Sequence, residues 1–132
     1  MRIHHIALSI ALSLGFSAAQ AASGHAHEDP HAVKALHGGI VSEAKHLTFE
    51  LVPQADKVTL HVRDHGKPVS TEGGTAKLSM VSGIIMRSAD LTPSGNGQLS
   101  AALDKPIAAG SKIVARVQLP GKKPVQVRFT IH

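Results

Sequence analysis

Apolar and polar residues alternate with a period of two along most of the chain after residue 46. Residues 46–51 and 58–63 show this alternation on either side of a turn at 53–56, which predicts an antiparallel hairpin. Similar runs predict further strands at 76–81, 84–91, 98–103, 112–119 and 125–131, separated by turns rich in Gly, Pro and Ser. No convincing long helix is present. We therefore expect an all-β domain, a small antiparallel β-sandwich of about seven strands with an Ig-like architecture.

The first residues have the pattern of an export signal. A basic start at Arg2 is followed by a mostly apolar run at 6–16 and by the small residues Ala19 and Ala21 on either side of Gln20. The apolar run is shorter than the ~20 residues needed to cross a bilayer. We expect a signal peptide at 1–21, a mature chain without a membrane span, a flexible His-rich tail at 22–39 and one domain at 40–132.

Composition excludes several classes of protein. The 132 residues contain no Cys, Trp or Tyr, which excludes disulfide scaffolds and thiolate metal sites and argues against stacking platforms for nucleic acid. The formal net charge is +5, but the cations are spread singly apart from the pair Lys122-Lys123 in a predicted turn, so we interpret them as a solvated surface with no nucleic-acid partner. No catalytic motif is present, so we expect a protein that is not an enzyme.

Histidine is unusually frequent, with ten copies, and four of them lie in the predicted tail: His25, His27, His31 and His37. Neutral imidazole binds Cu(II), Ni(II), Zn(II) and Co(II), and Cu(II) is favoured by the general order of affinities. Cleavage after Ala22 would place His25 third and create a square-planar nitrogen set, whereas cleavage after Ala21 would not. The alternative interpretation is a solubilising linker that binds metal incidentally.

A second group of candidate ligands lies on the predicted hairpin. With Thr48 opposite His61, the side chains of His46 and Glu50 lie diagonal to His61 at about 7–8 Å on one outward face. Two imidazoles and a carboxylate could meet over one ion there, and a fold-back of the His37 segment over this face would strengthen the site. The alternative is an ordinary solvated strand face. Met80 and Met86 are interpreted mainly as core residues, with Cu(I) ligation as the alternative.

Three segments suggest a family: His37-Gly38-Gly39, the strand at 47–52, and the stretch at 62–69 that includes Asp64-His65-Gly66. Together they resemble the small N-terminal domain of periplasmic adaptor subunits of heavy-metal efflux pumps, and stand-alone exported proteins of the same type. The resemblance covers about a third of the mature chain. It implies a periplasmic location, a link to divalent metal or copper, and a role for His37 and Glu50. The chain has none of the long helical hairpin of a full adaptor.

These patterns lead to two hypotheses. The first is a periplasmic metal-binding protein that buffers or delivers metal in a heavy-metal homeostasis or efflux system. The second is a non-catalytic exported module that docks on a larger envelope protein, with histidines that are incidental or sense pH. No pattern in the sequence indicates the oligomeric state.

Overall fold

The structure is a computed structural model and describes residues 33–132. The predicted signal peptide and the histidines His25, His27 and His31 lie outside the described residues. Within them no helix is long and apolar enough to cross a membrane. Residues 33–132 form nine strands: β1 (Ile40–Ala44), β2 (Leu47–Pro53), β3 (Lys57–Asp64), β4 (Lys67–Pro68), β5 (Thr75–Ser82), β6 (Ile85–Gly95), β7 (Gln98–Ala102), β8 (Lys112–Gln118) and β9 (Val125–Thr130). The seven predicted strands are all found, whereas β1 and β4 were not predicted.

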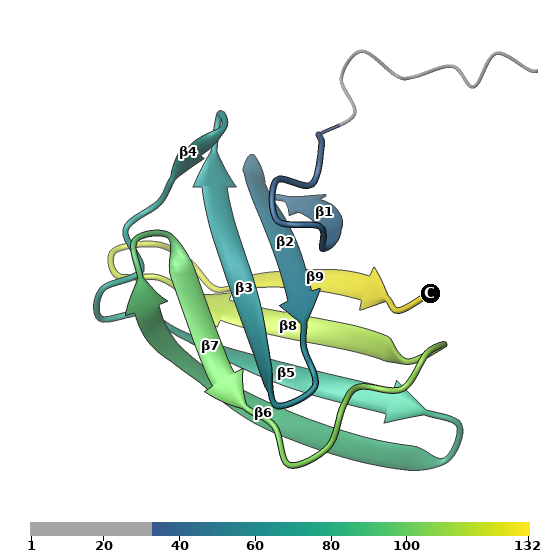
Figure 1. Ribbon diagram of the computed structural model, residues 1–132. Coiled ribbons are helices and arrows are strands. Elements are labelled where there is room, and N and C mark those ends of the chain that lie inside the picture. The colour runs from purple at the N-terminus through teal and green to yellow at the C-terminus, as the bar shows by residue number, and fades with distance from the viewer. Residues whose placement is uncertain (1–32) are drawn as a thin grey trace, which may run out of the picture. The chain divides into compact units, whose positions relative to one another are not determined.

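The prediction of an Ig-like β-sandwich is wrong, because the strands form a nearly closed barrel (Figure 1). All neighbouring strands are antiparallel, in the order β1-β2-β3-β7-β6-β5-β8-β9, with the short β4 paired to β3. The order is a single continuous path rather than two separate facing sheets. Its two ends, β1 and β9, lie in contact. A sandwich would instead leave two separate sheets with four edges.

The barrel interior is aliphatic and is built from every second residue of the strands. Phe49 and Phe129 are its aromatic members, as expected, and Met80 is buried beside them. Met86 is exposed, contrary to the prediction, because it lies on the outward face of β6. The other largest side chains that are fully buried in the core are Leu51, Leu60, Leu78, Leu91, Leu99 and Ile113.

The hairpin of β2 and β3 has a different register from the one predicted. The paired residues Pro53 and Val58 enclose a four-residue loop, 54–57, one residue further along the chain than predicted, so that Glu50 lies directly opposite His61. The shift is two residues, which leaves every side chain on its expected face. Thr48 therefore lies opposite Arg63 instead of His61.

A buried hydroxyl ties the segment before β5 to the turn between β6 and β7. Thr71 is 1% exposed, and its Oγ1 lies 3.0 Å from the carbonyl oxygens of both Gly95 and Gln98. The single hydroxyl proton is shared between these two carbonyls, which belong to the paired residues Gly95 and Gln98 beside the irregular register of β6. The contact links the segment before β5 to β7, whose residue Gln98 pairs with His61 of β3.

Candidate functional site

A buried carboxylate lies at the centre of the outward face of β2 and β3. Glu50 is 0% exposed, although its side chain points away from the barrel core. Its Oε1 accepts hydrogen bonds from the backbone N–H of His37 at 2.7 Å and of Gly39 at 3.0 Å. Its Oε2 accepts from the N–H of Leu36 at 3.0 Å. The carboxylate thus holds the segment that precedes β1 against the sheet.

Two glycines let this segment approach β2. A Cβ on Gly39 would lie 2.4 Å from the carbonyl oxygen of Leu51 and 2.9 Å from Cγ2 of Val52, which are distances that no side chain tolerates. Gly38 has a φ of 72°, in the left-handed region that favours glycine. The two glycines of His37-Gly38-Gly39 therefore have a structural role. They turn the backbone so that the N–H groups of Leu36, His37 and Gly39 all point at the Glu50 carboxylate.

The imidazole of His37 also contacts this carboxylate, with Nδ1 3.0 Å from Oε2 of Glu50. Burial by itself raises the pKa of Glu50, but the hydrogen bonds from Gly39, His37 and Leu36 outweigh it and lower the pKa to about 2. The carboxylate is therefore ionised at neutral pH and can only accept. Nδ1 of His37 must carry the proton, which leaves the lone pair of neutral imidazole on Nε2. The His37 side chain is 43% exposed.

His61 lies beside His37, and the two imidazoles are stacked with centroids 3.7 Å apart and planes 5° apart. Burial, and then the charge of His37, lower the pKa of His61 below 6.5, with Arg63 acting in the same direction and Glu50 opposing them. His61 is therefore neutral at neutral pH. Because the ring planes are parallel, the lone pairs of the two imidazoles lie in separate planes and cannot meet at one ion in this arrangement.

Arg63 completes the cluster from the strand β3. Its NH2 group donates to the carbonyl oxygen of Lys34 at 3.2 Å and lies 3.5 Å from Oε2 of Glu50. The residue is 6% exposed, and its Nε is buried without a hydrogen-bond partner. The guanidinium therefore supplies a buried positive charge beside the Glu50 carboxylate and a second link to the segment before β1.

The structure brings together three of the four predicted site residues that it describes. His37, Glu50 and His61 form one cluster, as a fold-back of the His37 segment requires. His46 is not part of this cluster. It lies in the turn between β1 and β2 with a φ of 67°. Four residues separate it from Glu50, which corresponds to about 13 Å along an extended strand. It lines a separate groove with Asp64 and other residues.

Sequence reasoning missed the role of Arg63 and of the backbone N–H groups at 36–39. The alternation of β3 does place Arg63 on the same face as His61, but the covering segment that buries this face has no strand or helix pattern of its own.

Within residues 33–132 there is no group of three or more His, Cys, Asp or Glu side chains that could hold a metal ion. The oxygens of Glu50 are already occupied by hydrogen bonds.

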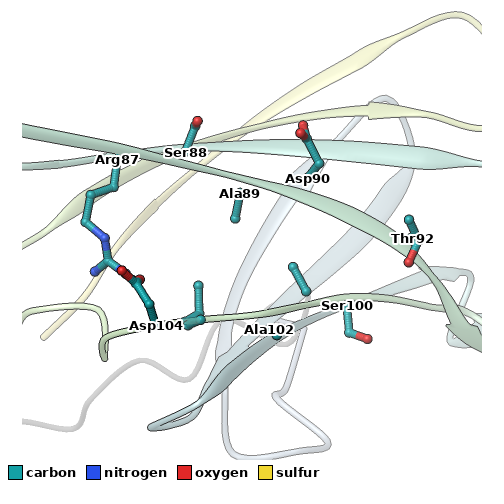
Figure 2. A pocket seen from close by; sticks show the side chains of 10 residues that line it. Arg87, Ser88, Ala89, Asp90, Thr92, Ser100, Ala102 and Asp104 are labelled. Carbon is teal, nitrogen blue, oxygen red and sulfur yellow. The ribbon is translucent and has the colours of Figure 1, made fainter.

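A polar groove of about 670 Å³ lies between β6 and β7, where the two strands diverge (Figure 2). At one end the guanidinium of Arg87 donates to the Asp104 carboxylate at 2.9 Å and to the carbonyl oxygens of Lys105 and Pro106. Asp90 and small side chains such as Ser88 and Ala102 line much of the rest. Its two carboxylates, Asp90 and Asp104, are exposed, unlike the buried carboxylate of Glu50.

Comparison with known proteins adds no relative, since the chain matches no protein-family model, no curated protein and no solved structure. The chemistry of the cluster around Glu50 is therefore the basis for any statement about function. It combines the oriented and half-exposed imidazole of His37, the imidazole of His61 stacked on it, and a carboxylate that binds both the backbone and the ring of His37.

Proposed function

We propose that the protein binds a transition-metal ion through its N-terminal histidines, with His37 as the ligand fixed to the folded domain. The observation that carries the proposal is the hydrogen bond between Nδ1 of His37 and the ionised carboxylate of Glu50. Histidines that bind metals usually donate their second ring nitrogen to a carboxylate, which fixes the tautomer and makes the free nitrogen more basic. Glu50 then positions His37 and does not itself contact the ion.

The ring stack with His61 supports the same role. It holds the plane of His37 while leaving its side chain half-exposed, so that Nε2 can meet an ion from solvent. One imidazole is not a complete site. His25, His27 and His31 lie within twelve residues of His37 in the sequence and would supply the remaining nitrogens. Such a set suits Cu(II) best, followed by Ni(II), Zn(II) and Co(II).

The predicted signal peptide and the resemblance to efflux-pump adaptor domains extend the proposal to the cell context. An exported chain with a partly assembled histidine site would buffer or deliver metal in the periplasm as part of a heavy-metal homeostasis or efflux system. Protons compete with metals for imidazole, so binding should weaken below about pH 6.

Calorimetric titration of the chain from Ala22 onward with Cu(II), Zn(II) and Ni(II) tests the proposal. We expect saturable binding with an affinity that His37→Ala lowers by tenfold or more. Glu50→Gln should lower it by about 10–100-fold, the usual effect of losing a group that orients a metal ligand. His132→Ala serves as the matched control, because His132 lies at the chain end away from Glu50 in sequence and is exposed.

Equal binding by the parent chain and the His37→Ala variant would contradict the role of His37. Absence of any binding tighter than millimolar would contradict the metal proposal as a whole and favour the docking module. A docking module would be indifferent to all three ions, and removing residues 23–31 would leave its partner binding intact.

A further inference from the structure

In the part of the chain that the structure describes, most of the exposed large apolar side chains gather at one hairpin tip. Within residues 33–132, five large apolar side chains are exposed, and four of them, Val81, Ile84, Ile85 and Met86, surround the turn between β5 and β6. Ile84 is 100% exposed and Met86 is 74% exposed. We call these four residues the apolar tip. Soluble proteins rarely leave such a contiguous apolar surface uncovered unless it meets a partner.

The strand register gathers cations on the sheet face that leads away from this tip. Residues directly opposite each other on neighbouring strands point to the same side of a sheet. Lys77 pairs with Arg116, Val81 pairs with Lys112, and Val114 pairs with Arg128.

The outward face of β5, β8 and β9 therefore presents four exposed cations, namely Lys77, Lys112, Arg116 and Arg128. We call these four residues the basic face. The neighbouring strand β6 adds one carboxylate to the same rows, Asp90, whose Oδ1 lies 3.8 Å from Nζ of Lys77. These cations are at least four residues apart in sequence, which is why they suggest no patch when the chain is read linearly.

We propose that the apolar tip and the basic face together bind the surface of an anionic phospholipid membrane, with the tip entering the acyl boundary. The apolar side chains match the hydrocarbon, and the excess of positive charge matches the lipid phosphates. Lys112 lies in the same row as Val81 and Met86, directly beside the tip, where the headgroups would be. A purely polar anionic partner would leave the apolar tip without a contact.

The rows of the basic face set the orientation of the domain on the membrane. Successive rows lie two residues apart along a strand, about 6.8 Å. Arg128 is one row beyond Lys112, and Arg116 and Lys77 are two rows beyond it. Electrostatic attraction in physiological salt decays over about 8 Å. The contribution of each cation to binding should therefore fall in the order Lys112, Arg128, Arg116.

Vesicle sedimentation tests this proposal with the chain from Ala22 onward, which lacks the apolar run of the predicted signal peptide. Vesicles of phosphatidylcholine mixed with phosphatidylglycerol should bind the protein, and vesicles of phosphatidylcholine alone should bind it at least tenfold more weakly. Lys112→Gln should weaken binding about fivefold, which corresponds to one cation at an anionic surface. Arg128→Gln and Arg116→Gln should have progressively smaller effects, and Lys57→Gln on β3 is the matched control without an effect.

Fluorescence gives an independent readout of the tip, because the chain contains no Trp. Ile84→Trp should show a blue-shifted emission on adding anionic vesicles. Leu36→Trp, which places the probe at the one exposed large apolar residue outside the tip among residues 33–132, should show no shift. Equal binding to both kinds of vesicle, or no shift at position 84, would overturn the proposal. Binding to neither kind of vesicle would overturn it as well and would point to a protein partner for the tip.

Discussion

His37 and His61 stack their imidazole rings face to face, 3.7 Å apart between centroids, although they come from segments more than twenty residues apart. The stack depends on Glu50, which lies opposite His61 in the β2–β3 ladder and holds both the backbone and the ring of His37. One carboxylate thereby positions the imidazole of His37 against the ring of His61. The following predictions concern this cluster and the barrel that carries it.

The pKa of Glu50 makes stability depend on acid pH. The folded-state pKa of about 2 lies below the ordinary value of 4.5, so the carboxylate stabilises the fold above pH 4.5. This contribution, about 3 kcal/mol, is lost as the pH falls from 4.5 through 2. Urea denaturation of the parent chain and of Glu50→Gln should show a difference in the free energy of unfolding that shrinks over this range. Glu43→Gln, at an exposed position of β1, is the control and should show no such trend.

His61 should titrate below pH 6.5 in the folded protein, because burial and the charge of His37 disfavour its protonated form. Its lowered pKa costs stability as the pH falls from 6.5 to the folded-state value, since the unfolded chain takes up the proton first. The ring proton shifts in NMR spectra measure this pKa directly. In His37→Ala the pKa of His61 should rise towards 6.5, because both the covering ring and its charge are removed. An unchanged value would contradict the stack in solution.

Gly39→Ala should release the segment before β1 from the sheet. The added methyl group would meet the carbonyl oxygen of Leu51, which belongs to a strand and cannot move aside. We expect a loss of about 1–3 kcal/mol, typical of overpacking. Hydrogen exchange of the amides of Leu36 and His37 should accelerate strongly. Gly38→Ala is the comparison: a methyl group there meets no atom within 4 Å and adds only backbone strain, so its effect should be smaller.

Thr71→Val should destabilise the barrel by about 1–2 kcal/mol, because the carbonyl oxygens of Gly95 and Gln98 lose their buried donor while the shape of the side chain is kept. Thermal unfolding followed by circular dichroism would measure the change. Thr75→Val, at an exposed position of β5, should stay within about 0.5 kcal/mol of the parent. Similar values for the two variants would show that the Thr71 hydroxyl contributes nothing.

The strands could be predicted from sequence because alternation is a local signal, and the runs beginning near residues 47, 58 and 76 correspond to β2, β3 and β5. The barrel could not be predicted in the same way, because its closure depends on pairings between distant segments, such as β3 with β7, and on the contact between β1 and β9. β1 escaped prediction since its five residues are only partly buried and show no clear alternation.

The sequence predicted most of the residues of the candidate site, but not how they are arranged. His61 and Glu50 were placed on one face because a two-residue shift in register preserves faces. Their burial was not expected, because polar residues that alternate along a strand usually face solvent. Here the segment before β1 is hydrogen-bonded to Glu50, for example through the N–H of Gly39, and covers this face. His46 was misplaced because a positive φ in a tight turn has no hydrophobic signature.

The meeting of β1 and β9 has a mechanical consequence. Ladder hydrogen bonds join each strand to its neighbours along the path, but the two terminal strands touch without joining the ladder. A load applied between residue 40 and the C-terminus would therefore open this junction first. Each terminal strand would then peel away from its inner neighbour bond by bond, so that the domain yields gradually and at low force instead of resisting as one rigid body.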